Sequence, residues 1–309
     1  SRAVVTRSIT NFGASVRERL LQDTKKKRGD FQLTLRRYVI ERFLYRLGQS
    51  DYRERFVLKG AMLFMLWDTS IYRPTKDLDL AGYGVNDALS LIERIRKILA
   101  IPCPEDGIVF MTESMTAEPI RDGAEYHGFR LRVIGELAAA RISLQIDVGF
   151  GDAIEPPATL ETYPVILDAP APRIRAYPRE VSIAEKLHAM VTRGLENTRL
   201  KDFYDVYVLS SRFMFLGARL GSAITATFAR RGTTMGDPWP VALTSDFYDD
   251  PARAQAWRRL LQRTKLDAGT PGDFATIGEQ IRSFLDSPLR ASQLGKPHIA
   301  TWPPGGPWE

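Results

Sequence analysis

Hydrophobic positions along the chain recur with two periods, and the two periods fall in different parts of the sequence. Helical spacing predicts helices over residues 15–27 and 33–47, a short one over 61–67, and one over 86–99 capped by Asn86. Buried runs and alternating patterns predict strands over residues 56–58, 108–111, 126–134 and 141–150, with one more in the segment of Asp77 and Asp79. After residue 178 the spacing is helical, over residues 179–193, 201–213, 216–230, 251–264 and 274–285.

A proline-rich passage over residues 156–178 separates the two patterns and is typical of a crossing between domains. We therefore expect two domains. Residues 1–170 would hold N-terminal helices and a mixed sheet, and residues 171–309 a helical C-terminal domain, which together make an α+β protein. The tail over residues 302–309 is rich in proline and glycine and is expected to be irregular.

Two carboxylates lie one residue apart, in the segment that reads Arg73-Pro74-Thr75-Lys76-Asp77-Leu78-Asp79-Leu80. In an extended chain Asp77 and Asp79 project from one face, while Leu78 and Leu80 turn to the other. Adjacent negative charges are costly unless a cation lies between them, so the pair suits Mg²⁺ or Mn²⁺. A solvated strand end with two acids is the plainer interpretation of such a pair.

A third acid, Asp147, lies on the polar face of the alternating strand over residues 141–150. Three carboxylates on adjacent strands can hold two divalent ions roughly 3.5–4 Å apart, which is the arrangement of two-metal phosphoryl transfer. Asp147 is our candidate for the third ligand, although an isolated Asp at such a position is more often exposed. Asp152 is a competing candidate, or the cap of a turn.

Composition restricts the chemistry. With one cysteine and three widely spaced histidines in 309 residues, the chain has no internal disulfide and no zinc pattern, so any metal ligands would be oxygens. No apolar stretch approaches the roughly 20 residues that span a bilayer, and the first residues lack a signal-peptide core, so we expect a cytoplasmic protein without a membrane partner.

The net charge of +6 and the pI near 9.4 favour a polyanionic partner. Basic residues gather near the N-terminus, and they are expected to form an RNA- or DNA-binding surface or a plain solvated helical face: Arg17, Arg19, Lys25, Lys26, Lys27, Arg28, Arg36, Arg37, Arg42 and Arg46.

Several cations are placed to contact phosphates. Lys59 and Gly60 form a turn that leads into a predicted helix, whose first N–H groups favour an anion, and Arg73 and Lys76 flank the acids. Lys186 lies at the edge of an apolar stripe, where a lysine usually extends its amine to water. Taken alone, the segment with Lys201, Asp202 and Asp205 reads as an ordinary ion pair on a helix surface.

Four motifs in this order resemble the AbiEii/AbiGii-type nucleotidyltransferases, the toxins of bacterial abortive-infection and toxin–antitoxin systems, which include the MenT toxins. The motifs are Val57-Leu58-Lys59-Gly60-Ala61 with Arg73-x-Thr75-x-Asp77-x-Asp79-Leu80, Ile146 to Asp152, Ile183 to Ala189, and Arg199-x-Lys201-Asp202-x-x-Asp205. They span about half of the chain.

The resemblance implies a polymerase-β-like nucleotidyltransferase fold and gives the residues their roles. Asp77 and Asp79 would bind metal; Asp147 stays our candidate third ligand from the strand pattern, because these toxins vary in whether a third acid binds metal. The nucleotide phosphates would contact Lys59, Gly60, Arg73, Lys76, Lys186 and Lys201, and the catalytic set would be Asp77, Asp79, Lys186, Asp202 and Asp205. It also implies an NTP substrate and a cognate antitoxin.

We therefore expect a metal-dependent toxin that transfers a nucleoside monophosphate from an NTP to an acceptor hydroxyl, with the tRNA 3′ end favoured over other RNA or a protein. One alternative is a non-catalytic nucleic-acid-binding protein on a nucleotidyltransferase fold. Another is a glycosyltransferase that uses Asp-x-Asp for a nucleotide-sugar metal, against which the helical N-terminus argues.

Overall fold

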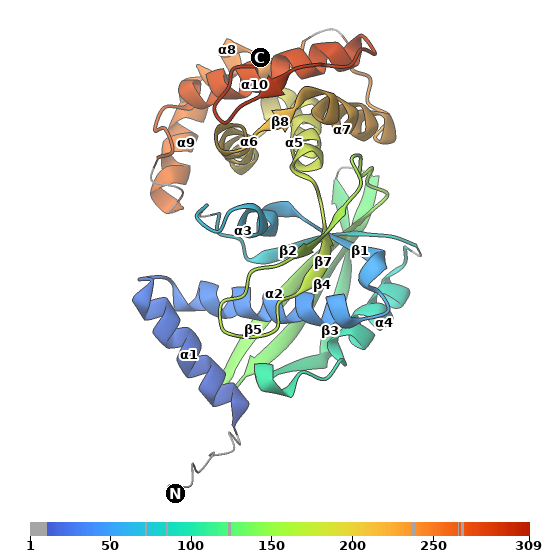
Figure 1. The fold of residues 1–309 in the computed structure, drawn as a ribbon, viewed down its shortest axis with the longest axis vertical. Helices are drawn as coiled ribbons and strands as arrows, with labels where there is room; N and C mark the ends of the chain where they lie inside the picture. Colours follow the sequence, from blue (N-terminus) through green and yellow to red (C-terminus); the bar gives the residue numbers. More distant parts are fainter. Residues whose placement is uncertain are drawn as a thin grey trace, which may run out of the picture. The chain divides into compact units, whose positions relative to one another are not determined.

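The computed structural model describes residues 11–71, 73–84, 86–122, 125–236, 239–264, 266 and 269–309. The chain divides into two compact units, which Figure 1 shows in sequence colours. Unit 1 comprises residues 1–150 and 160–176, and unit 2 comprises residues 151–159 and 177–309. In the ranges just given, no helix has both the length and the apolar character to cross a membrane.

Unit 1 is built on a mixed sheet. Within the described residues it has seven strands in the order β3-β4-β5-β2-β1-β7-β6. The strands are β1 (Phe56–Lys59), β2 (Asp77–Gly82), β3 (Ile108–Asp122), β4 (Glu125–Leu137), β5 (Ala140–Phe150), β6 (Thr159–Thr162) and β7 (Arg173–Ala176). Strand β2 runs parallel to β5 and β1 parallel to β7, whereas the β1–β2, β3–β4 and β4–β5 pairs are antiparallel.

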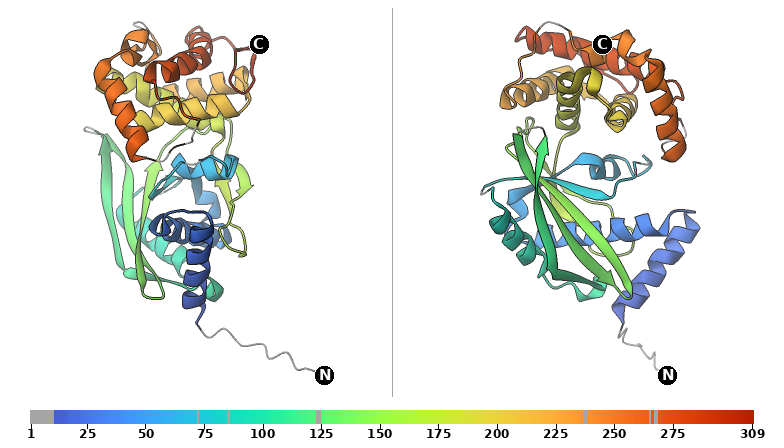
Figure 2. Two further views of the ribbon diagram at one scale, coloured as in Figure 1. Left: turned by 90° about the vertical axis from the view of Figure 1, so that its left-hand side faces the viewer. Right: turned by 180° about the vertical axis from the view of Figure 1, so that it is seen from behind.

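The helices of unit 1 are α1 (Phe12–Lys26), α2 (Phe31–Gln49), α3 (Leu63–Trp67) and α4 (Ala88–Leu99), with short 3₁₀ turns η1 (Arg53–Arg55), η2 (Gly60–Met62) and η3 (Pro104–Asp106). Helix α2 packs against β5 and β7, and α4 packs against β3. Helices α2 and α4 contact each other, and Figures 1 and 2 show both on one side of the long strands. Alternation in β2 and β5 buries Leu78, Leu80, Ile146 and Val148 and leaves the acidic side chains of these strands on the other, half-exposed face.

Two of the basic residues expected at the surface are instead buried in α2. Arg42 pairs with Glu41 at 2.8 Å and donates to the carbonyl of Pro170, while Arg46 pairs with Asp106 at 2.5 Å. These side chains are at most 4% exposed, because α2 turns this side toward the core, where each charge needs a partner. The prediction that Arg42 and Arg46 add to a positive surface was therefore wrong.

Unit 2 is a helical bundle. Its helices are α5 (Arg179–Arg193), α6 (Leu200–Arg212), α7 (Gly217–Arg230), α8 (Ser245–Tyr248), α9 (Pro251–Arg263) and α10 (Phe274–Gln293), with 3₁₀ turns η4 (Gly194–Glu196) and η5 (Val241–Leu243) and a small sheet of β8 (Phe215–Leu216) and β9 (Thr301–Trp302). Helix α5 packs against α6 and α7, and α10 packs against α6, α7 and α8. Aromatic rings fill the core, where Phe203 contacts Phe247, Tyr248 and Phe274.

The α+β class, with N-terminal helices, a mixed sheet and a helical C-terminal part, is confirmed. Within the proline-rich passage the chain passes between the two units, and the passage also contributes β6 and β7 to the sheet. Three local predictions were wrong. Asp87 rather than Asn86 caps α4, accepting from the Ser90 N–H at 2.8 Å. Helix α10 continues through Pro288, and the irregular tail begins with Trp302 paired in β9.

Candidate active site

Strand register places four charged residues in a row across the polar face of unit 1. Lys59 on β1 lies opposite Asp79 on β2, Asp79 is the register partner of Asp147 on β5, and Asp147 lies opposite Arg130 on β4. Residues paired in this way project from the same face of a sheet, with Cβ atoms about 4.5–5.5 Å apart in antiparallel pairs. The row therefore reads cation, carboxylate, carboxylate, cation, and we call it the charged row.

Gly60 brings the backbone against the Asp79 carboxylate. Its φ of +73° lies in the left-handed region, and a Cβ built there would be 2.8 Å from both Cβ and Cγ of Asp79 and would overlap its Oδ2. Only glycine fits this position without displacing the carboxylate. The helical segment that follows consists of the three-residue η2 and the five-residue α3, so the expected anion contact at this turn rests on Lys59 more than on a helix dipole.

Asp77 lies two residues before Asp79 on β2, opposite Gln145 on β5. Partial burial raises its pKa, and the negative charge of Asp147 raises it further, while Arg130, Arg36 and Lys76 act in the opposite direction. Asp77 and Asp147 are thus close enough to repel each other. A cation between the carboxylates of this face would relieve that repulsion.

Asp147 is held by Arg130 in a two-point ion pair. Arg130 Nε donates to Oδ1 at 2.9 Å and Nη2 to Oδ2 at 2.7 Å, while Gln145 Nε2 approaches Oδ1 at 3.3 Å. The side chains of Arg130 and Asp147 are 35% and 17% exposed, so the pair is only partly screened by water. Among the described residues no three acidic, histidine or cysteine side chains are grouped to hold one ion. Because Arg130 engages both carboxylate oxygens of Asp147, Asp147 would have to leave Arg130 to become a third ligand.

The donor set of β2 nevertheless fits a hard divalent cation. Asp77 and Asp79 offer carboxylate oxygens on one half-exposed face, where burial raises the pKa of Asp77 and the negative charge of Asp147 raises it further. The flanking cations differ in exposure. Lys76 is exposed, whereas Arg73 is half-buried and donates to the Pro74 carbonyl at 3.2 Å.

The remaining predicted residues lie in unit 2, where α5 and α6 bring them together. Lys186 Nζ on α5 is 2.8 Å from Asp202 Oδ1 and 2.7 Å from Asp205 Oδ2 on α6, and Arg199 Nε is 2.8 Å from Asp202 Oδ2. Asp205 is 1% exposed and Lys186 is 17% exposed, so this is a largely buried charge cluster. Lys201 is exposed at the start of α6. The expected surface ion pair of this segment is instead a pairing between two helices.

A family model for the nucleotidyl transferase AbiEii toxin of type IV toxin–antitoxin systems matches residues 42–285. The chain belongs to this family. It is therefore a nucleotidyltransferase, and the family implies a nucleotide substrate and an antitoxin partner. Membership in the family sets aside the glycosyltransferase alternative.

Two crystal structures of Helicobacter pylori proteins are similar to the chain. One is described as a "putative nucleotidyltransferase" and the alignment covers 91% of this chain and 98% of that one; the other is JHP933, with 93% and 98% covered. Both have a TM-score of 0.44 and 16% sequence identity. No curated protein matches the chain.

Three arginines near the AbiEii-family motifs were not predicted as site residues. Arg130 holds Asp147, Arg36 acts on the charge of Asp77, and Arg199 completes the cluster around Asp202. Arg130 could have been predicted from the sequence, because it lies on the polar side of the alternating strand predicted over residues 126–134.

Asp152, the competing metal candidate, lies in unit 2 and is engaged by two side chains. It accepts from the Tyr177 hydroxyl at 2.9 Å and pairs with Arg231 at 3.1 Å. These contacts favour a structural role for Asp152 within unit 2.

Proposed function

We propose that this AbiEii-family chain transfers a nucleoside monophosphate from an NTP to a hydroxyl at the 3′ end of RNA, with tRNA as the favoured acceptor. The observation that carries the proposal is the charged row together with Asp77, which lies two residues before Asp79 on β2, so that two β2 carboxylates lie on a half-exposed face beside Lys59 and the Gly60 turn.

In this proposal Asp77 and Asp79 bind a divalent ion, Mg²⁺ or Mn²⁺. When bound, the ion supplies charge neutralisation at the phosphates and lowers the pKa of the attacking hydroxyl. Lys59, Arg73 and Lys76 bind the negatively charged phosphates. Arg130 holds the Asp147 carboxylate in place beside the other acids through its two hydrogen bonds.

Lys186 and Lys201 remain proposed triphosphate contacts, and Lys186 is paired with Asp202 and Asp205. A lysine between two carboxylates keeps its charge and is held in one position, which suits the orientation of a phosphate. Asp202 and Asp205 would then contribute to catalysis by holding Lys186 in position.

The acceptor surface is proposed on the exposed run Lys25 to Arg28, at the end of α1. All four side chains are exposed, and Lys27 also pairs with Asp23 at 2.9 Å. Their replacement by serine should lower the affinity for tRNA and flatten the slope of log affinity against log salt, since fewer counterions are released. Arg96→Ser with Lys97→Ser on α4 is the matched control, and an equal slope in both variants would move the acceptor surface elsewhere.

Transfer itself is tested with each labelled NTP, Mg²⁺ and total tRNA, comparing the wild type with Asp79→Ala and the exposed control Asp51→Ala. We expect Asp79→Ala to abolish transfer while its melting temperature is maintained, because loss of one carboxylate weakens the metal site and also relieves like-charge repulsion. Near wild-type transfer by a folded Asp79→Ala protein would refute the assignment. If the label appeared on protein instead of RNA, the proposed acceptor would be wrong, but the proposed transfer of a nucleoside monophosphate would stand.

A further inference from the structure

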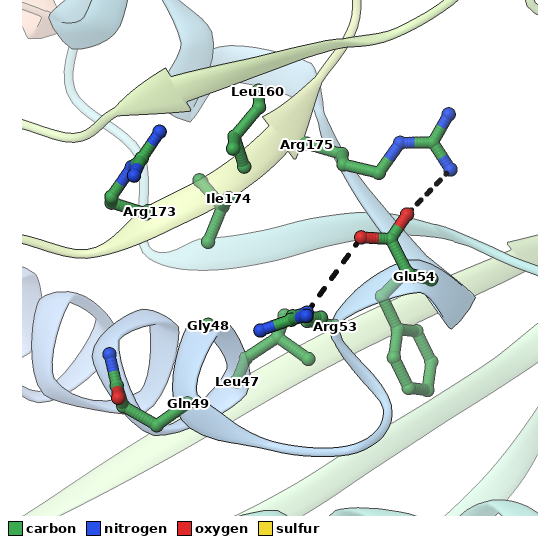
Figure 3. Close-up of a pocket in the computed structure, with 10 residues that line it drawn as sticks. Leu47, Gly48, Gln49, Arg53, Glu54, Leu160, Arg173, Ile174 and Arg175 are labelled. Carbon is green, nitrogen blue, oxygen red and sulfur yellow. Dashed lines mark hydrogen bonds and ion pairs between the residues drawn. The ribbon is translucent and has the colours of Figure 1, made fainter.

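Unit 1 contains a cavity that none of the proposed site residues line. Its volume is about 410 Å³, and it lies between the C-terminal end of α2, the η1 turn and strand β7, with Leu160 of β6 at one side (Figure 3). Ligand sites usually measure about 300–1,000 Å³, so the cavity is large enough for a group of mononucleotide size. Gly48 of α2 lies against β7 so closely that a Cβ there would be 2.5 Å from the Arg173 carbonyl oxygen, and this contact fixes one wall.

Positive charge dominates the cavity. Three arginines line it, Arg53, Arg173 and Arg175, against the single carboxylate of Glu54. Arg173 is exposed and makes no ion pair with any described residue. Guanidinium groups bind phosphate through two parallel hydrogen bonds, so this set of side chains favours a phosphate-bearing ligand.

Glu54 is a loosely held anion between two of the arginines, as the dashed lines in Figure 3 show. Its carboxylate is 3.9 Å from Arg53 Nε and 3.5 Å from Arg175 Nη1, both beyond the usual hydrogen-bond distance of about 2.7–3.2 Å. The Glu54 side chain is 65% exposed and is free to move into solvent. A phosphate at the same place would contact both guanidinium groups more closely than this carboxylate does.

The cavity also has apolar walls. Leu47, Phe56 and Ile174 are at most 3% exposed and form its inner side, whereas Leu160 is 54% exposed at the edge. Apolar side chains and guanidinium planes both accept the flat face of a nucleobase. The cavity therefore offers guanidinium groups for a phosphate and an adjacent apolar wall for a nucleobase, which are the two parts of a nucleoside phosphate.

We propose that this cavity binds a nucleoside phosphate at a second site on unit 1, with the phosphate held by Arg53, Arg173 and Arg175 and Glu54 competing with it. The ligand is a free mononucleotide or a single nucleotide of an RNA strand, which share this chemistry. The site does not depend on a metal ion or on the charged row.

The test is calorimetric titration of the full chain with AMP, with inorganic phosphate and with pentaadenylate, in EDTA and low salt. Arg173→Met and Arg175→Met should each weaken AMP binding about tenfold or more, and Glu54→Gln should strengthen it severalfold, because the competing anion is gone. Arg141→Met, at an exposed position of β5, is the matched control and should bind as the wild type does. The opposite sign at Glu54 distinguishes a phosphate site from general destabilisation.

Two outcomes identify the source of the nucleotide, and both support the proposal. AMP and pentaadenylate of equal affinity indicate a free mononucleotide, while pentaadenylate at least tenfold tighter, with the same arginine dependence, indicates an RNA strand. The proposal would be overturned if inorganic phosphate bound as tightly as AMP, or if all variants bound AMP with the wild-type affinity. It would also be overturned if oligoglutamate, but not AMP, displaced bound pentaadenylate.

Asp79→Ala should bind AMP in EDTA as the wild type does. AMP binding in EDTA therefore tests the cavity proposal, and NMP transfer tests the transferase proposal, independently of each other. Should Arg175→Met not fold, the exposed positions Arg173 and Glu54 still decide the outcome.

Discussion

Replacement of Gly60 by alanine is the sharpest perturbation of the charged row. The new methyl group would occupy the space of the Asp79 carboxylate, at 2.8 Å from its Cβ and Cγ, and the backbone would keep a φ of +73° that alanine disfavours. Both effects act on the residue proposed to hold the metal. We expect Gly60→Ala to fold less stably and to lose transfer activity.

The two contributions have different sizes. An L-residue in the left-handed region costs roughly 1–2 kcal/mol, and forcing a side chain out of a packed position adds about 1–3 kcal/mol. Gly60→Ala should therefore lower the free energy of unfolding of unit 1 by about 2–5 kcal/mol. A displacement of Asp79 by roughly 1 Å should lower the transfer rate about 100-fold.

Gly84→Ala is the matched control, because it carries the backbone penalty without the overlap. Gly84 has a φ of +92°, and the nearest atom to its added Cβ is Arg55 Nη1 at 3.6 Å, an ordinary contact. Urea unfolding of the two single variants separates backbone strain from overlap. Transfer of labelled NMP to tRNA, measured on the same preparations, reports the position of Asp79.

A double-mutant cycle with Asp79→Ala completes the test. Removing the carboxylate removes most of the overlap, so Gly60→Ala should cost about 1 kcal/mol less in that background than in the wild type. Equal costs in both backgrounds, or equal unfolding energies for Gly60→Ala and Gly84→Ala, would refute the contact between Gly60 and Asp79.

Substitutions at three further positions test the charges around the site and in unit 2. Arg130→Met should raise the pKa of Asp77, because the positive charge of Arg130 lowers it, so the acidic limb of the pH–rate profile should move to higher pH; an unmoved limb would contradict the role given to Arg130. Lys186→Met should destabilise unit 2 by about 3–5 kcal/mol in urea unfolding, because two buried carboxylates lose their cation, while Lys186→Arg should retain most of the stability. Burial lowers the pKa of His188 to about 4, with Arg231 adding to the effect, so the folded state keeps it neutral and stability should fall as pH drops from about 6.5 to about 4. His188→Gln should remove that slope, which amounts to about 1–3 kcal/mol across the window, and an unchanged slope would assign it to other groups.

The sequence determined the features that depend on local spacing. Alternation placed Asp77 and Asp79 on one face of a strand, and helical spacing gave α5 over residues 179–193 with the bounds that the structure shows. Both periods are properties of the backbone itself, so they hold before any long-range contact forms. The four motifs gave the family for the same reason, since each is a short local segment.

Register and burial were decided only by the tertiary structure. The opposition of Asp79 to Asp147, and of Asp147 to Arg130, requires strands β2, β5 and β4 to pair at one offset, and a shift of one residue would turn each side chain to the other face. Arg42 reads as a surface cation in the sequence and is buried against Glu41, because the core side of α2 is fixed by what packs on it. Long-range packing alone can pair Lys186 of α5 with Asp205 of α6, since no local period relates residues on two helices.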